Sequence, residues 1–107
     1  MILVEGFKSV WRLYDYGIYN VACVMGSFLT EGQLELVKTY ALNGVVLFFD
    51  ADKAGKDGAI LAEDSCKKKG IKFYKEIISL EDVEKEEDGP AELSCEQAYR
   101  YLNAYIR

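Results

Sequence analysis

The 107-residue sequence contains no histidine, only three cysteines and no long apolar segment. The absence of histidine excludes histidine-based acid–base catalysis and histidine-ligated zinc. Cys23, Cys66 and Cys95 form no CxxC pair, which argues against a zinc knuckle or a disulfide framework and favours a reducing cytoplasm. No apolar run approaches the roughly 20 residues that cross a bilayer, so we expect no membrane association and no signal peptide.

The chain also lacks an excess of basic residues. Its net charge is −5, and seven acidic residues fall between positions 81 and 92. An acidic domain does not attract nucleic acid by its overall charge. If the protein acts on a polyanion, it does so through metal ions or partner domains. The acidic run at 81–88 itself is interpreted as a solvated loop.

What the sequence does contain is an alternation of apolar strands with amphipathic helices. Strands are predicted at 2–4, 19–25, 45–49 and 71–75. Helices are predicted at 7–16, from a capping box at Thr30 and Gln33, from after Gly55 to about Lys69, and from a second capping box at Ser94 and Gln97 to Ile106. Short links between alternating strands and helices predict one α/β domain, with a parallel four-stranded sheet flanked by helices.

Acidic residues follow two of the predicted strands. Glu5 closes the first strand, and Asp50 and Asp52 follow the apolar run at 45–49. In an open parallel sheet, ligands bind beyond the carboxyl ends of the strands. If the first and third strands are neighbours, the three carboxylates converge, and oxygen ligands alone favour Mg²⁺ or Mn²⁺. An aspartate at a strand end can instead form a turn or cap a helix. For Asp50 taken alone, this alternative has about the same weight as metal binding.

These residues, taken together with their flanking glycines, resemble a Toprim domain, the metal-binding module of bacterial-type primases, topoisomerases and some nucleases. The resemblance to the primase branch covers nearly the whole chain. It rests on Val4-Glu5-Gly6, residues 5–9, Gly26-Ser27, Phe49 to Lys56, and Asp88 to Leu93.

The resemblance implies a Toprim (Rossmann-like) fold and a set of functional residues. It implies metal binding and acid–base work for Glu5, metal binding for Asp50 and Asp52, and part of an additional acidic site for Asp88. Ser9 stands where bacterial primases often have an aspartate, which is a departure from the family pattern.

Several basic residues lie near the predicted acidic site. Lys53 and Lys56 follow the aspartates and are candidates for phosphate contacts. The equally weighted alternative is that they are solvent-exposed lysines at the start of a helix, with no ligand. Lys8 and Arg12 lie one turn apart on the first helix and are candidates for facing nucleic acid.

The function that the resemblance implies is Mg²⁺-dependent nucleotidyl transfer by a cytoplasmic DNA primase. Its partners are a single-stranded DNA template, nucleoside triphosphates and, through domains absent here, a replicative helicase. We expect residues 1–107 to be one Toprim domain from a larger primase-type protein, with little activity in isolation. The alternatives are a Toprim nuclease that activates water with the same acids, and a non-catalytic Toprim scaffold for nucleic-acid processing.

Overall fold

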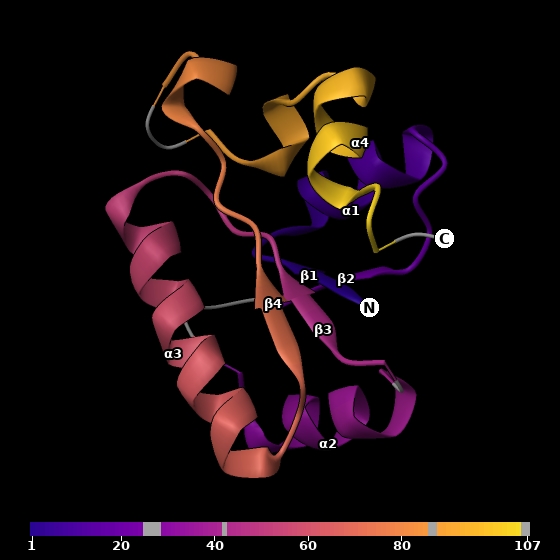
Figure 1. Cartoon of the computed structure of the whole chain (residues 1–107), viewed down its shortest axis with the longest axis vertical. Coiled ribbons are helices and arrows are strands. Elements are labelled where there is room, and N and C mark those ends of the chain that lie inside the picture. Colours follow the sequence, from indigo (N-terminus) through magenta and orange to yellow (C-terminus); the bar gives the residue numbers. More distant parts are fainter. Residues whose placement is uncertain (25–28, 42, 86–87, 106–107) are drawn as a thin grey trace.

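A four-stranded parallel sheet forms the centre of the computed structural model, which describes residues 1–24, 29–41, 43–85 and 88–105 (Figure 1). The strands are β1 (Ile2–Val4), β2 (Val21–Cys23), β3 (Val45–Leu47) and β4 (Phe73–Lys75). The helices are α1 (Phe7–Asp15), α2 (Glu31–Tyr40), α3 (Lys53–Lys69) and α4 (Cys95–Leu102), and two short 3-10 turns are η1 (Leu80–Asp82) and η2 (Pro90–Glu92). The predicted α/β class and four-stranded sheet are therefore confirmed.

The strand order is β2-β1-β3-β4, and every neighbouring pair is parallel. Leu3 of β1 pairs with Leu47 of β3, and the backbone N–H of Phe48 donates to the carbonyl of Leu3 at 2.9 Å. The first and third strands are thus neighbours, which the sequence argument required. β1 has the predicted bounds, whereas the other three strands are shorter than predicted. In β3, regular pairing ends at Leu47 although Phe48 and Phe49 stay buried.

Alternating side chains of the strands divide the core between the two faces of the sheet, as period-two geometry requires. Leu3, Val45 and Leu47 face α2 and α3, whereas Val4 and Phe48 face α1 and α4. Figure 1 shows α2 and α3 apart from α1 and α4, with the strands between the two pairs. Because both faces are covered, β1 and β3 carry buried apolar residues at every position.

The capping signals in the sequence mark the starts of two helices. Thr30 and Gln33 exchange both capping-box hydrogen bonds at the start of α2, and Ser94 and Gln97 do so at the start of α4. Both capping predictions are confirmed. The described part of α4 ends at Leu102, and Ile106, which was assigned to its apolar face, lies outside the described residues.

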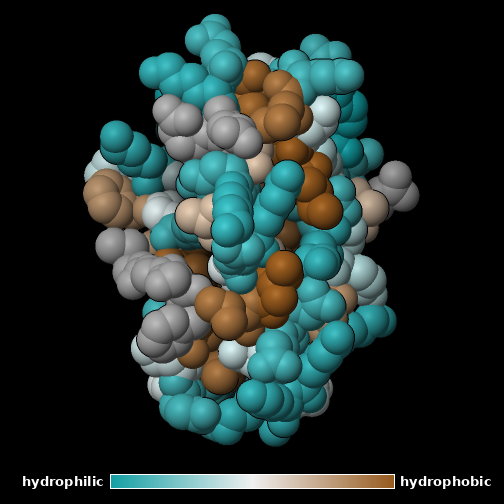
Figure 2. Space-filling model, turned by 90° about the vertical axis from the view of Figure 1, so that its left-hand side faces the viewer, coloured by the Kyte–Doolittle hydropathy of each residue, from teal (hydrophilic) through white to brown (hydrophobic). Residues whose placement is uncertain are grey.

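The long helix α3 carries ion pairs on its outer side. Lys67 pairs with Glu63 at 3.4 Å, and Lys68 pairs with Asp64 at 3.1 Å. Figure 2 shows this side of the molecule, where hydrophilic side chains predominate around a narrow hydrophobic band. Within the described ranges, no helix combines the length and apolar character needed to cross a membrane.

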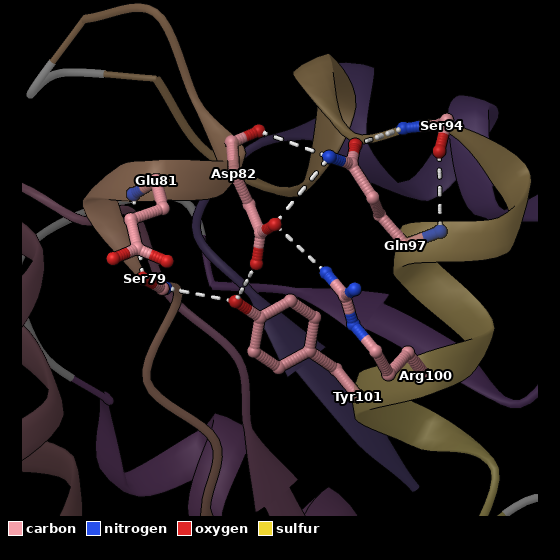
Figure 3. Close-up of polar contacts among 7 residues, drawn as sticks. All are labelled: Ser79, Glu81, Asp82, Ser94, Gln97, Arg100 and Tyr101. Atoms are coloured by element: carbon pink, nitrogen blue, oxygen red, sulfur yellow. Dashed lines mark hydrogen bonds and ion pairs between the residues drawn. The ribbon is translucent and has the colours of Figure 1, made fainter.

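The interpretation of the acidic run as a solvated loop is wrong for Asp82. Its side chain is only 17% exposed. One carboxylate oxygen accepts from the guanidinium of Arg100 at 2.7 Å, and the other accepts from the hydroxyl of Tyr101 (Figure 3). Asp82 belongs to η1, and Arg100 and Tyr101 both belong to α4, so these contacts join the two elements. Long-range partners therefore bury a charge that the local sequence places in solvent.

Candidate metal and nucleotidyl-transfer site

The carboxylate of Glu5 links the ends of the two central strands. Its Oε1 accepts a 2.8 Å hydrogen bond from the backbone N–H of Asp50. Since β1 and β3 are adjacent and parallel, both residues emerge at the same edge of the sheet. This is the edge where open parallel sheets bind ligands.

The helix-capping role considered for Asp50 belongs instead to Asp52. Asp52 is the N-cap of α3, and its Oδ1 accepts from the backbone N–H of Gly55 at 2.7 Å. Gly55 is required here, since an added Cβ would lie 2.2 Å from the carbonyl oxygen of Asp50. The close passage of α3 past the end of β3 therefore holds the two aspartates at one place.

The segment that follows η1 completes the site from the other side. The backbone N–H of Ala51 donates to the carbonyl of Asp88 at 3.2 Å. Gly89 packs so closely that an added Cβ would lie 1.8 Å from Oδ1 of Asp50. Oδ2 of Asp88 accepts from the backbone N–H of Lys85 at 3.0 Å. Two segments far apart in the sequence thus meet around the carboxyl group of Asp50.

Helix α1 fixes this second segment in place. The hydroxyl of Tyr16 donates to the carbonyl of Leu93 at 2.6 Å, and Nε of Arg12 donates to the carbonyl of Ala91 at 3.2 Å. Glu92 lies between these anchors, and its Oε2 accepts from the backbone N–H of Gly89 at 2.8 Å. The 88–93 segment is therefore docked on the same helix that starts beside Glu5.

Negative charge accumulates around Asp50. Burial raises the pKa of its carboxyl group, and repulsion from neighbouring carboxylates raises it further, to about 7. The repelling groups are Glu5, Asp52, Glu92 and Asp88, in decreasing order of effect. Within the described part of the chain, none of these five carboxylates forms an ion pair with a lysine or arginine. The charge of the site is therefore not offset by basic side chains described here.

The donors at this site suit a hard divalent cation. All are carboxylate oxygens, the ligands that Mg²⁺ and Mn²⁺ prefer. Four of the five carboxylates already have one oxygen oriented by a backbone N–H, which leaves the other oxygen to a ligand. Among the described residues, however, no three acidic or cysteine side chains are arranged as a ready-made metal site. Cation binding here remains a prediction that the chemistry of the donors favours.

The predicted basic residues lie at two different places. Lys8 lines a cleft of about 870 Å³, whose walls also include Arg12, Asp88 and Glu92. Lys53 and Lys56 are exposed on the first turn of α3 and do not line this cleft. Lys8 and Arg12 thus lie where α1 meets the 88–93 segment, whereas Lys53 and Lys56 do not. Gly26 and Ser27, which carried part of the resemblance, lie outside the described residues.

Glu92 is a site residue that the sequence argument missed. The resemblance includes the 88–93 segment but implies a role only for Asp88 within it. Helical spacing gave no signal for Glu92, because η2 is a 3-10 turn of three residues, Pro90–Glu92, that does not include Asp88. The effect of Glu92 on Asp50 was not visible in the spacing, since it depends on how the segment docks.

Comparison with known proteins shows the family of this chain. A model of the Toprim domain matches residues 1–75. A DNA primase from Clostridium acetobutylicum is 38% identical over 82 residues, which cover 77% of this chain and 13% of the relative. DNA primases from Aquifex aeolicus (33% identity) and Lactococcus lactis (36%) match 68% of this chain and 14% and 11% of their own lengths. The chain therefore spans only about an eighth of the first of these relatives, and it belongs to the Toprim family.

Proposed function

We propose that this chain is the catalytic Toprim domain of a DNA primase, a nucleotidyltransferase that makes RNA primers on single-stranded DNA from nucleoside triphosphates. The observation that carries the proposal is the group of four carboxylates around Asp50, whose charge is not offset by an ion pair with any described basic residue. Family membership and the similarity to several DNA primases support it.

In this proposal Asp50, Asp52 and Glu5 hold Mg²⁺ or Mn²⁺, and Asp88 and Glu92 enlarge the acidic surroundings. When bound, the cation supplies the positive charge that activates a primer 3′-hydroxyl and steadies the departing pyrophosphate. In the same proposal Glu5 also accepts the hydroxyl proton, and the hydrogen bond from the N–H of Asp50, which orients its carboxylate, supports this role.

An acidic domain engages a polyanion here through local contacts. Lys8, Lys53 and Lys56 are exposed and serve as phosphate contacts in this proposal. We further propose that residues 1–107 form one Toprim domain of a longer protein, whose other parts hold the template and meet the helicase. Three free cysteines suit a reducing compartment such as the cytoplasm.

The test is template-directed ribonucleotide incorporation on single-stranded DNA by the full parent protein. Glu5→Gln is nearly isosteric and keeps an oxygen that accepts from the N–H of Asp50, so the fold is retained. We expect a loss of about 10²–10⁴-fold in rate, as is typical when a positioned acid–base group is removed.

Glu81→Gln is the matched control, because Glu81 is exposed in η1 and outside the site. It should act as wild type. Full primer synthesis by Glu5→Gln would remove the catalytic role. A parent protein that cleaves nucleic acid and makes no primers would instead assign the carboxylates to a nuclease.

A further inference from the structure

Four aromatic side chains form an exposed strip along α1. Phe7, Trp11 and Tyr14 recur at i, i+4 and i+7, the spacing that places side chains on one face of a helix. Tyr19, in the link to β2, extends the row. These side chains are 46%, 64%, 48% and 66% exposed in chain order. We call them the aromatic strip.

The rings of the aromatic strip contact each other rather than the core. Phe7 and Trp11 meet edge to face at 4.9 Å, and Tyr14 and Tyr19 do so at 5.3 Å. The core side of α1 is formed by Ser9 and Leu13, which are buried against the sheet. Packing of the described fold therefore does not account for these four large rings, and their mutual contacts hold them in place for a ligand.

Positive charge accompanies the aromatic strip. Lys8 and Arg12 lie one turn apart on α1 and are two of the three basic residues in the first 50 positions. The Nε of Arg12 donates to the carbonyl of Ala91, and Arg12 and Trp11 line the same cleft. Asp15 is the one acidic residue of the helix. Two of the three cations in the first 50 positions thus lie beside exposed aromatic rings, on a cleft whose walls also carry Asp15, Asp82, Glu84, Asp88 and Glu92.

The aromatic strip also starts at the carboxylate site. Helix α1 begins two residues after Glu5, and its first two turns advance by about 10 Å. The cleft that Lys8 and Trp11 line extends to Asp88 at the acidic site. Exposed rings with flanking cations are the combination that binds single-stranded nucleic acid, because bases stack on the rings and phosphates meet the cations.

We infer that the aromatic strip is a binding surface for single-stranded nucleic acid, on which unpaired bases stack at Trp11 and phosphates contact Lys8 and Arg12. The inference rests on the proposed function and identifies where the strand lies next to the carboxylates. A basic peptide is the less suitable occupant, since Lys8 and Arg12 would repel it along the whole strip.

Trp11 is the only tryptophan of the chain, so its fluorescence reports on this surface alone. The 107-residue chain is titrated with oligo(dT) of about twelve nucleotides, in EDTA and at low salt, because stacking and phosphate contacts need no metal. We expect saturable quenching of Trp11. The absence of saturable quenching would overturn the inference, and so would a fluorescence change with protein concentration alone, which indicates a second copy on the strip.

Variants are compared by fluorescence anisotropy of labelled oligo(dT). Trp11→Ala should weaken binding about 10- to 100-fold, and Trp11→Phe should restore part of it. Lys8→Gln should lower the salt dependence by about 0.7 in the logarithmic slope, as expected when the protein neutralises one phosphate fewer on a single strand. Tyr40→Ala is the matched control, because Tyr40 is 69% exposed on α2, away from α1 in Figure 1. Equal weakening by Trp11→Ala and Tyr40→Ala would overturn the inference.

Failure here is distinguishable from failure of the proposed function. Asp50→Asn removes a carboxylate of the metal site and should leave metal-free oligonucleotide binding at least as strong as in wild type. Primer synthesis by the parent protein without Trp11-dependent binding would overturn this inference alone. Trp11-dependent binding in a parent protein that makes no primers would overturn the proposed function alone.

Discussion

The backbone N–H of Asp50 donates to Oε1 of Glu5 at 2.8 Å, across 45 positions of sequence. Glu5 therefore has a structural role as well as the proposed chemical one, since it accepts from a backbone N–H three residues after the end of β3. The two roles are separable, because the hydrogen bond needs only an acceptor oxygen, whereas proton transfer needs a carboxylate.

Glu5→Ala and Glu5→Gln separate these two roles in the isolated chain. Glu5→Ala leaves the N–H of Asp50 without its acceptor, which typically costs about 1–3 kcal/mol for a buried group and less where water reaches it. Glu5→Gln keeps an acceptor oxygen and should stay near the wild-type stability. Urea denaturation at neutral pH measures both. Equal destabilisation by the two variants would show that the charge of Glu5, not its hydrogen bond, supports the fold.

Gly89→Ala should disturb the site without straining the backbone. The φ of Gly89 is −131°, which alanine adopts freely, but the new Cβ would lie 1.8 Å from Oδ1 of Asp50. The carboxyl group must move, and overpacking of this kind typically costs about 1–3 kcal/mol. Thermal unfolding measures the decrease in stability.

Gly32→Ala is the control for that substitution. Gly32 lies in α2, where an added Cβ meets nothing within 4 Å, so alanine should be neutral or stabilising by up to about 1 kcal/mol. If Gly89→Ala melts like wild type, the 88–93 segment does not press on Asp50 as described.

Asp82 should make the fold sensitive to acid. The hydrogen bond from Tyr101, followed by the Arg100 contact, lowers the pKa of Asp82. Its stabilising contribution is therefore fully present above the ordinary aspartate value of 3.8 and is lost as the pH falls through the lower folded-state pKa.

Asp82→Asn tests this contribution by urea denaturation at several pH values. The variant should be less stable than wild type at pH 7, and the difference should shrink below about pH 3.8. Glu84→Gln, an exposed neighbour, should track wild type throughout. A difference that is constant with pH would mean that the charge of Asp82 is not what its partners stabilise.

Local sequence was enough to predict the sheet and the edge at which the acids emerge. The apolar runs at 2–4 and 45–49 mark strands buried on both faces, and residues at the carboxyl ends of parallel neighbours meet at one edge. The capping boxes at Thr30 and Ser94 could also be predicted from local sequence, because the partner of each residue lies only three positions away.

Docking of the 88–93 segment could not be predicted in this way. The contacts that place it join Arg12 to Ala91 and Tyr16 to Leu93, which are 79 and 77 positions apart. No periodicity encodes such pairs. Glu92 and Asp82 were therefore missed as members of organised clusters, although both belong to an acidic run that is plain in the sequence.

The central claim is that the carboxylates around Asp50 bind a divalent cation, and thermal unfolding with and without millimolar Mg²⁺ tests it most directly. Wild type should gain stability from Mg²⁺ by mass action on the folded state. The double variant Asp50→Asn, Asp52→Asn should melt higher than wild type in EDTA at pH 8, since it relieves charge repulsion while asparagine still caps α3, and it should gain little from Mg²⁺. An equal gain from Mg²⁺ in both proteins would contradict the account, because the ion would then bind elsewhere.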